Sequence, residues 1–545
     1  MTQLQKVLCI HPDDSMLVAL SDLASGDVVQ WEDESILICT PVKGKHKLAR
    51  RAFAVGEMLS LYGVPVGKAI EPIRRGEAIT TLNLKHYAAE VDLSATTPYR
   101  WDAPDVGAFH GMTFSGVVRP DGRVGTANYW LIFPLVFCEN RNVEHLRNAL
   151  EGPLGYATND LAALTLSLMS DDIGAEADIS LLDVPAPSRM RPFPNLDGVR
   201  IITHAGGCGG TRADARSLCK ILAAYADHPN VAGITVFSLG CQNAQITMFQ
   251  QALKLQNPAF DKPCLIYEQQ QWESESTMMK TVLKDTLSSL KQANNIARQP
   301  VPLSQLKIGV KCGGSDGFSG ISANPAMGLV SDMVVALGGS SILAEFPELC
   351  GVEANLIARC ERDEDKRRFL GLMQDFERRA VSVGTSLSEN PSPGNIRDGL
   401  ITDAMKSAGA AKKGGTSPIV SVLEYGEQTD KSGLALLCTP GGDVESVSGI
   451  VASGANVVLF STGMGTPTGN PIVPVLKISS NTRVATKMAD LIDFDCGPVI
   501  EGAPLSVIAT QLLNMVIATA GGQYQAKADR LQQYDFMFWK RDISL

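Results

Sequence analysis

A histidine and a cysteine stand among four glycines in the segment His204-Ala-Gly-Gly-Cys-Gly-Gly. Glycine-rich backbone leaves its amides free to hold an anion, and a histidine can move a proton or bind a metal. The segment therefore predicts His204 as an acid or base, and Gly206 and Gly207 as substrate contacts. A tight turn around a buried Cys208 explains the same residues equally well. Dinucleotide binding is disfavoured, because Arg212 stands where the third glycine of that motif belongs.

The segment Lys311-Cys-Gly-Gly-Ser-Asp-Gly-Phe-Ser-Gly joins a cation, a thiol and a carboxylate to bare backbone. It lacks the final Gly-Lys-Ser/Thr of a phosphate loop, which disfavours nucleotide hydrolysis. Lys311 is suited to polarise a substrate carboxylate, and Asp316 to bind a metal or act as a base. A surface turn with a solvated lysine and aspartate is the weaker alternative. The predicted substrate contacts of this loop are Gly313, Gly314 and Ser315.

Two glutamates, Glu348 and Glu353, flank the short segment Leu-Cys-Gly-Val. Carboxylates this close in sequence supply the hard oxygen ligands that divalent cations prefer, so we predict both as metal ligands. Acidic residues are also favoured at the start of a helix, where they complement the helix dipole, and this simpler explanation has the greater weight.

Other polar residues also follow apolar stretches. Gly240-Cys-Gln-Asn supplies Cys241 and Asn243, although it also fits a hydrogen-bonded turn. Ser461-Thr-Gly-Met-Gly-Thr offers hydroxyl groups and free amides suited to a polyol or carboxylate, and an ordinary turn explains it equally well. From these segments and the one that follows we predict the substrate contacts Asn243, Thr462, Gly463, Thr466 and Lys477. His46, in the basic stretch Lys43-Gly-Lys-His-Lys, is a further catalytic candidate, with a solvated surface histidine as the alternative.

The elements that must position these residues alternate between strands and helices. From residue 125 onward, apolar strand-like runs end in glycine-rich or polar loops and lead into amphipathic stretches. This alternation predicts parallel α/β sheets, whose ligands bind at the carboxyl ends of the strands. Residues before 94 read as short strands with turns. We expect a small β domain (1–93), a linker (94–115) and two Rossmann-like α/β domains (116–300 and 301–545).

The composition excludes several classes of protein. Hydrophobic residues make up 45% and charged residues 19% of the 545-residue chain, which is a globular balance. The net charge of −10 and the absence of a long basic run disfavour nucleic-acid binding. No signal peptide or membrane-spanning run is present, so we expect a soluble cytoplasmic protein. The twelve cysteines contain no Cys-x-x-Cys pair, which disfavours a zinc site of the usual spacing.

Taken together, the motifs resemble the altronate/galactarate dehydratase family in their order along the chain. The resemblance includes Gly122-Arg-Val-Gly-Thr-Ala-Asn-Tyr, Phe346-Pro-Glu-Leu-Cys-Gly-Val-Glu and Gly414-Gly-Thr-Ser-Pro as well as the loops above. The first 90 residues resemble the β-clip SAF domain of such enzymes. Two departures stand out. Thr80-Thr-Leu-Asn replaces a His-x-His-Asn stretch of many relatives, and Met464 occupies a position where arginine is common.

The resemblance implies loss of water from an aldonate or aldarate, altronate first, to give a 2-keto-3-deoxy acid. It also implies a divalent metal, Fe(II) before Mn(II). Cys208, Cys241 and Cys312 are additional soft ligands, or the holders of an iron–sulfur cluster in the rival interpretation. Rival functions are galactarate dehydratase, sulfolactate sulfo-lyase and a sugar-acid-binding regulator without catalysis. We expect a homodimer whose partner molecules are small sugar acids, not nucleic acids or membranes.

Overall fold

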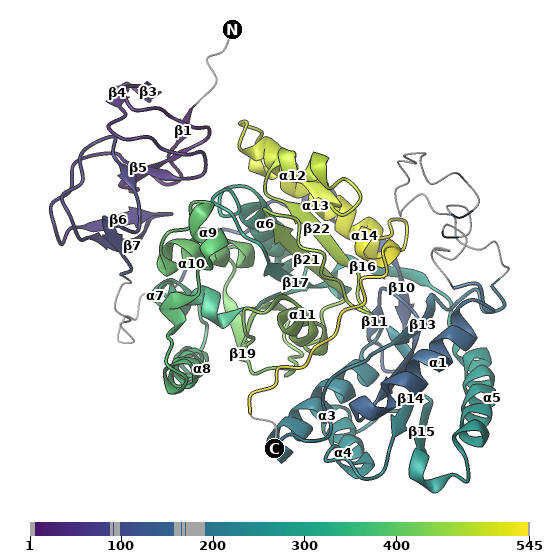
Figure 1. The fold of residues 1–545 in the computed structure, drawn as a ribbon. Coiled ribbons are helices and arrows are strands. Elements are labelled where there is room, and N and C mark those ends of the chain that lie inside the picture. The colour runs from purple at the N-terminus through teal and green to yellow at the C-terminus, as the bar shows by residue number, and fades with distance from the viewer. Residues whose placement is uncertain are drawn as a thin grey trace.

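The computed structural model describes residues 6–87, 99–156 and 191–542, with the single residues 91, 165 and 169. Part of the predicted linker, residues 94–98, lies outside the described residues. Among the described helices, none combines the length and apolar character that crossing a bilayer requires. Figure 1 shows two helix-flanked sheet regions and, at one side, a smaller part built from strands.

The small N-terminal part consists of short antiparallel strands, as its turn-rich sequence predicts. Four of them form a sheet in the order β1-β2-β5-β8, and the others form the hairpin β3-β4 and the sheet β6-β7-β9. Gly76 turns with a φ of 77°, and a side chain there would overlap the carbonyl oxygen of Leu37. The strands are β1 (Val7–Leu8), β2 (Met16–Ala19), β3 (Val28–Trp31), β4 (Glu34–Leu37), β5 (Lys47–Ala49), β6 (Met58–Leu61), β7 (Val64–Ala69), β8 (Ala78–Ile79) and β9 (Leu84–Lys85).

A first parallel sheet has the strand order β13-β12-β14-β15. Every residue of β12 and β14 is buried, as expected for parallel strands covered by helices on both faces. The strands are β12 (Tyr129–Pro134), β13 (Gly198–Ile201), β14 (Val231–Ser238) and β15 (Cys264–Glu268). The helices are α1 (Asn140–Glu151), α3 (Arg212–Asp227), α4 (Ile246–Gln256) and α5 (Glu275–Ala293).

A second parallel sheet has seven strands in the order β19-β20-β18-β17-β21-β22-β23. Its strands are β17 (Lys307–Cys312), β18 (Ser340–Leu343), β19 (Ile419–Leu423), β20 (Gly433–Leu437), β21 (Val457–Thr462), β22 (Val475–Ser479) and β23 (Phe494–Asp495). The helices are α6 (Ala323–Ala336), α7 (Glu353–Ala358), α8 (Asp363–Ser382), α9 (Pro393–Arg397), α10 (Asp403–Ala411), α11 (Asp443–Ala452), α12 (Thr482–Lys487), α13 (Leu505–Ala520) and α14 (Lys527–Arg530).

A small antiparallel sheet connects these parts. β10 (Thr113–Val118) pairs with β11 (Val124–Gly125) and with β16 (Gln299–Pro302). β10 therefore begins inside the segment predicted as a linker. β10 precedes the first parallel sheet along the chain and β16 follows it, so the segments on either side of that sheet are paired with each other. The chain is thus a mixed α/β protein with parallel sheets and an N-terminal part of antiparallel strands.

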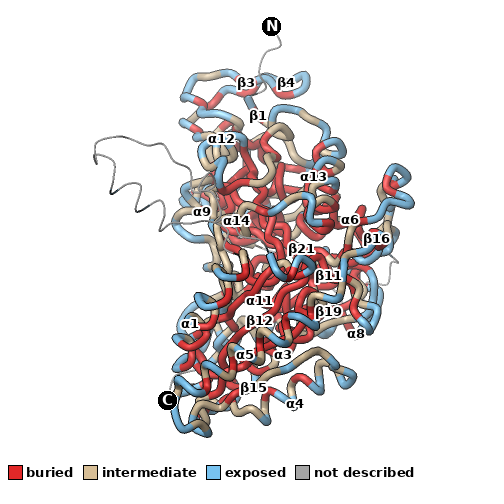
Figure 2. Tube along the Cα trace, turned by 90° about the vertical axis from the view of Figure 1, so that its right-hand side faces the viewer, coloured by how far each residue is buried: buried red, intermediate tan, exposed pale blue. Residues whose placement is uncertain are grey.

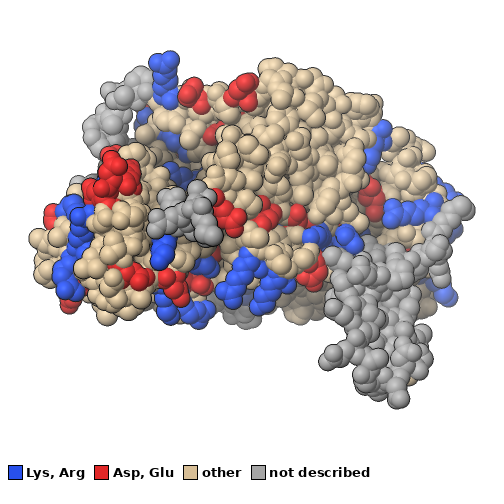
Figure 3. Space-filling model, turned by 90° about the horizontal axis from the view of Figure 1, so that it is seen from above, with Lys and Arg blue, Asp and Glu red and all other residues tan. Residues whose placement is uncertain are grey.

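Buried residues run through the interior of both parallel-sheet regions and into the N-terminal part (Figure 2). One apolar cluster joins the N-terminal residues Phe53 and Tyr62 to Phe346 and Phe369 beyond the second sheet. A shared core of this kind fixes the N-terminal part against the larger sheet. On the face shown in Figure 3, acidic and basic side chains are interspersed.

Candidate active site

The neighbouring strands β17 and β18 end where the candidate site begins. β17 ends with Lys311 and Cys312, and Glu345 follows β18 after one residue. Glu345 has a left-handed backbone with φ 72°, and its amide donates to Thr439 Oγ1 at 3.0 Å. Such a conformation is uncommon outside glycine and persists only where the surroundings enforce it. The turn directs the Glu345 carboxylate back toward the end of β17.

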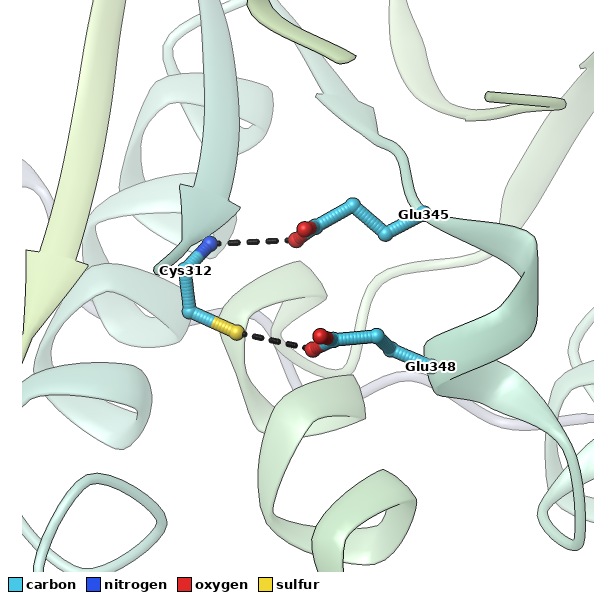
Figure 4. Close-up of side chains that lie close together, drawn as sticks. All are labelled: Cys312, Glu345 and Glu348. Carbon is cyan, nitrogen blue, oxygen red and sulfur yellow. Dashed lines mark hydrogen bonds between the residues drawn. The ribbon is translucent and has the colours of Figure 1, made fainter. Parts of the chain in front are cut away.

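Cys312, Glu345 and Glu348 lie together at this edge of the sheet (Figure 4). The amide of Cys312 donates to Glu345 Oε2 at 3.1 Å, and its thiol donates to Glu348 Oε2 at 3.1 Å. All three residues are buried. Glu348 stands on the short 3-10 helix η5 (Phe346–Leu349), which the Phe346-Pro347 step begins.

Three lysines surround the two glutamates. Lys311 Nζ lies 2.7 Å from Glu345 Oε1, and Lys413 Nζ lies 2.8 Å from Glu345 Oε2. Lys406 Nζ lies 2.9 Å from Glu348 Oε1. Each carboxylate is therefore held by at least one ammonium group, as burial of charge requires. We refer to Lys311, Cys312, Glu345, Glu348, Lys406, Lys413 and Asp443 as the charge cluster.

Asp443, at the start of α11, completes the cluster by forming an ion pair with Lys311. The cluster then holds three ammonium groups and three carboxylates, which balance without another ion. The side chain of Asp443 is 30% exposed, whereas those of Lys311 and Glu345 are fully enclosed. Asp443 is thus the carboxylate of the cluster most accessible to solvent.

Ion pairing keeps the glutamates and lysines of the charge cluster ionised. Burial opposes ionisation of Glu348, but Lys406 and the other two lysines outweigh it and lower the Glu348 pKa to about 2. Burial likewise opposes the charge on Lys311 and Lys413, yet the neighbouring acidic groups hold the pKa of both above the ordinary value. Burial raises the pKa of the Cys312 thiol to about 12. At neutral pH the cluster therefore contains ion pairs and a protonated thiol.

Asp316 lies on the loop that follows β17 and is fully buried. Its carboxylate accepts hydrogen bonds from Ser319 at 2.9 Å and from Ser480 at 2.8 Å, among others. Lys45 of the N-terminal part reaches the same carboxylate, with Nζ 2.8 Å from Oδ2. Lys45 has a φ of 76°, so a strained turn delivers this side chain. Asp316 thereby ties together the β17 loop, the end of β22 and the N-terminal part.

The loops after β17 and β21 are in direct contact. A side chain added at Gly314 would lie 2.8 Å from Thr466 Oγ1 and 3.3 Å from Thr462 Oγ1, so these backbones approach closely. The hydroxyl of Thr462 accepts hydrogen bonds from the amides of Gly465 and Thr466 at 2.9 and 3.2 Å. The substrate contacts predicted on these two loops therefore share one sheet edge, as the carboxyl ends of neighbouring parallel strands should.

Cys312, Glu345 and Glu348 could hold a metal ion, because one ligand atom from each lies within 4.8 Å of the others. Two carboxylates and a sulfur suit Fe(II), and the carboxylates also suit Mn(II). The donor set therefore fits the cation that the family resemblance implies. Lys413 is the competitor, since its ammonium already contacts both Cys312 Sγ and Glu345 at 2.8 Å. A cation bound there must displace it.

Three family models match successive parts of this chain. The family models "Altronate/galactarate dehydratase SAF domain", "D-galactarate dehydratase/Altronate hydrolase, second domain" and "D-galactarate/Altronate dehydratase, C-terminal" match residues 5–87, 116–294 and 303–544. The chain belongs to the altronate/galactarate dehydratase family. The resemblance inferred from the motifs is thereby confirmed, and the N-terminal part is a SAF domain.

The similar curated relatives span nearly the whole chain. Altronate dehydratase of Bacillus subtilis (strain 168) is 33% identical over 94% of this chain and 95% of its own length. Altronate dehydratase of Escherichia coli (strain K12) is 32% identical over 98% of this chain and 99% of its own length. Galactarate dehydratase (L-threo-forming) of the same organism is 27% identical over 96% of this chain and 94% of its own length.

The structure places His204 in a second glycine-rich loop, which follows strand β13 of the first parallel sheet. Its Nδ1 accepts from the Gly206 amide at 3.1 Å, and its Nε2 lies 2.8 Å from the Pro134 carbonyl oxygen. Burial lowers its pKa to about 4. A neutral ring with Nε2 protonated satisfies both contacts. Both nitrogens therefore have backbone partners, and the acid–base role of His204 stays a prediction.

The other residues predicted on this loop line a separate cavity. A space of about 350 Å³ is bounded by Gly206, Gly207, Cys208 and Asn243, with Phe538 of the C-terminal segment opposite. Cys208 and Cys241 are exposed, whereas Cys312 is buried in the charge cluster. Among the described residues, no hydrogen bond or ion pair joins the 204–211 loop to the charge cluster. The two sets of predicted site residues thus form two separate groups.

Three further candidates lie outside the charge cluster, and Glu353 takes the helix-start position that the sequence analysis gave as the alternative. Glu353 accepts from the Gly351 amide at 2.7 Å and begins α7, outside the metal-ligand group. His46 Nε2 lies 2.9 Å from the Arg397 carbonyl oxygen, while its neighbour Lys45 reaches Asp316. Lys477 is fully buried, its Nζ lies 4.3 Å from the Phe460 ring centre, and burial lowers its pKa to about 7.

Several residues of the site were not selected from the sequence. Glu345 follows a strand-like run and stands two residues before Pro347, a signal that points to a strand-end turn. Lys406 and Lys413 carry no such signal, because they lie on α10 and on the short helix η7 (Lys412–Gly414), far along the chain from β17. Asp443 begins a helix, where an acidic residue is ordinary. Only the folded chain brings these charges together.

Proposed function

We propose that the chain is a hydro-lyase that removes water from an aldonate or aldarate, with altronate as the first substrate to test. The observation that carries the proposal is the similarity to two altronate dehydratases over more than nine-tenths of the chain. The product is a 2-keto-3-deoxy acid. The similarity to a galactarate dehydratase makes galactarate the second substrate to test.

The charge cluster suits the difficult step of this reaction. Removing the proton next to a carboxylate creates an enediolate, whose negative charge must be stabilised as it forms. Lys311, Lys406 and Lys413 stay charged because acidic groups surround them. Ammonium groups fixed before the reaction need no reorganisation as the charge develops. We assign Lys311 and Lys406 to stabilising the enediolate, while Lys413 contributes only when no cation occupies its position.

Two partly exposed side chains connect the cluster with the substrate. Asp443 is the cluster carboxylate that solvent reaches, and we assign it to moving a proton at the substrate. Lys45, whose side chain is 24% exposed, stands beside Asp316 on the SAF side. We assign Lys45 to binding the substrate and Asp316 to positioning Lys45 and the β17 loop.

Metal dependence belongs to the same proposal. Cys312, Glu345 and Glu348 are the residues that would hold Fe(II) or Mn(II), and a cation there supplies further stabilisation of the enediolate. The chain's own contribution is the buried ligand set, with Lys413 filling the position when no cation is bound. Metal content measured on wild-type protein and on the Glu348→Gln variant tests this assignment directly. Equal metal content in the two proteins contradicts it.

The domain organisation also enters as a proposal. We propose a SAF domain (1–93), a linker (94–115) and two Rossmann-like domains (116–300 and 301–545), one for each parallel sheet. Support comes from the separate strand orders of the two sheets. The contact of Lys45 with Asp316 supports a role for the SAF domain in completing the site.

The decisive experiment is a substrate screen with the full-length chain. The protein is incubated with altronate, galactarate and sulfolactate, and 2-keto-3-deoxy acid or sulfite is measured. We expect keto acid from altronate, loss of activity with a chelator, and recovery with Fe(II) or Mn(II). Asp443→Asn should remove turnover, whereas the matched exposed variant Asp490→Asn should not. Binding of aldonates without keto acid indicates a regulator, and sulfite release indicates a sulfo-lyase.

A further inference from the structure

A buried arginine outside the charge cluster has guanidinium nitrogens without hydrogen-bond partners among the described residues. Arg200, on β13, is 4% exposed, and its Nε and Nη1 have no hydrogen-bond partner among the described residues. The described residues also form no ion pair with it within 4.0 Å. Its guanidinium lies between two aromatic rings, 4.5 Å from the ring centre of Tyr129 and 4.3 Å from that of Tyr534. Stacking orients the guanidinium but leaves its N–H groups unsatisfied.

The same arginine borders a cavity of about 230 Å³. Arg298 lies on the cavity wall, where it is held by the Ser115 and Thr126 carbonyl oxygens and by Asp197. The ionisable side chains that line the cavity comprise three arginines, two aspartates and three tyrosines: Arg191, Arg200, Arg298, Asp197, Asp529, Tyr129, Tyr156 and Tyr524. Because Asp197 is already paired with Arg298, the lining carries an excess of positive charge.

The cavity lies between parts of the chain that are distant in sequence. Thr126 and Arg200 come from the first parallel-sheet region, while Thr519 and Asp529 come from α13 and α14 beside the second sheet. Figure 1 shows α14 near the junction where β10 and β13 approach the second sheet. A ligand here contacts both regions at once.

We propose that this cavity binds a small oxyanion, a carboxylate or a phosphate, separately from the dehydratase site. A planar guanidinium presents several N–H groups in a fixed arrangement that matches both groups. Asp529 and Glu151 act on Arg200 only from beyond ion-pair distance, so a ligand that satisfies its free N–H groups binds with a gain that an already paired arginine cannot give. The hydroxyl groups of Thr126 and Thr519 on the cavity wall already donate to the carbonyl oxygens of Asn456 and Met515, so the guanidinium groups are the donors offered to the ligand.

Binding is measured on the full-length protein by calorimetry and by thermal denaturation. Inorganic phosphate and malonate are titrated separately at constant ionic strength, with chloride as the reference. We expect a saturable rise in melting temperature with at least one of them, and the tighter ligand identifies the oxyanion class. Absence of any saturable effect from both ions overturns the proposal.

Variants show whether the effect arises in this cavity. Arg200→Met should weaken binding at least tenfold, while Arg483→Met, an exposed arginine on α12, should leave it unchanged. If Arg200→Met does not fold, Arg200→Lys replaces it, because it keeps the charge but loses the planar fork, and the same tenfold loss is expected. Unchanged affinity in the folded Arg200 variant overturns the proposal. Sugar-acid turnover without added anion should persist in that variant, so this outcome is independent of the dehydratase assignment.

Discussion

Two glycine-rich loops follow parallel strands in this chain, and they differ in what covers them. The 204–211 loop after β13 borders an open cavity, with an exposed Cys208 and a histidine held by backbone groups. The loop after β17 is enclosed, with Asp316 buried and Lys45 of the SAF domain in contact with it. Similar sequences therefore have different chemical environments after β13, an edge strand of the first sheet, and after β17, the central strand of the second.

The difference arises from long-range packing. The loop after β17 is contacted by residues 395–399 and by the SAF turn at Lys45, because Asn395 donates to Ser315 and Lys47 donates to Gly399. The loop after β13 is contacted by segments of its own sheet region, where the Asn243 amide donates to Gly207, and by the C-terminal segment, where Thr211 donates to Asp542 at 2.7 Å. Enclosure lowers the effective dielectric constant and strengthens every charge interaction in the site. We therefore propose that the chemistry occurs at the enclosed loop.

The largest effect is expected from removing one charge of the cluster. Glu345→Gln leaves Lys311 and Lys413 short of their counter-charge, and breaking a buried pair in this way costs about 3–5 kcal/mol. Turnover should fall about a thousandfold or more, because the orientation of two ammonium groups is lost. Denaturant unfolding and steady-state kinetics measure the two effects.

A matched control is Glu353→Gln, since Glu353 is near in sequence but outside the cluster. It should keep turnover within about threefold of wild type and lose less than about 1 kcal/mol. A second test is the double variant Glu345→Gln/Lys413→Met, which restores charge balance and should recover part of the lost stability without recovering turnover. If Glu345→Gln keeps near-normal turnover, the comparison of the two loops is wrong.

The next effect concerns the SAF domain. Lys45→Ala removes the ammonium group beside Asp316, and we expect turnover to fall about ten- to a hundredfold with a higher KM, the scale of a lost charged substrate contact. Lys43→Ala is the control, because Lys43 is an exposed lysine of the same basic stretch. Equal kinetics of the two variants would show that the SAF domain is not part of the site.

A pH effect on stability is expected from Asp403, which is buried beside the cluster. Burial is the main cause that raises its pKa to about 8 from an ordinary 3.8. Between these values the folded chain binds a proton that the unfolded chain has lost, so stability falls as pH rises from about 4 to 8, by at most about 1.4 kcal/mol per pH unit. Asp403→Asn should remove this loss and melt at a higher temperature than wild type at pH 8.

Asp363→Asn is the matched control for that measurement. Both aspartates begin a helix, but Asp363 is exposed at the start of α8. Its variant should follow the pH dependence of wild type. The assignment of the bound proton to Asp403 is contradicted if the difference in melting temperature between wild type and Asp403→Asn is the same at pH 8 as at pH 5.

The sequence predicted the architecture better than the site. Apolar runs followed by glycine-rich loops correctly indicated β13, β14, β17, β18 and β21, because hydrophobic period and turn residues are local signals. The same reasoning selected Lys311, Cys312 and Glu348, which follow or end such strands. It did not select Lys406, Lys413 or Lys45, because their importance comes from contacts across about 60 to 270 residues of chain.

The smallest effect on turnover is expected from substitution of His204, which tests whether the loop after β13 takes part in catalysis. If His204 serves to hold the turn, His204→Gln should lose about 1–3 kcal/mol of stability, the cost of unsatisfied buried groups, with turnover changed less than about threefold. The wild-type histidine also predicts a pH signature. Burial lowers its pKa to about 4 from 6.5, so wild-type stability falls as pH drops through that interval, and the variant lacks this part of the fall. Melting curves from pH 4 to 7 and turnover at pH 7 measure both. A hundredfold loss of turnover with unchanged melting temperature would return the catalytic role to His204 and to the loop after β13.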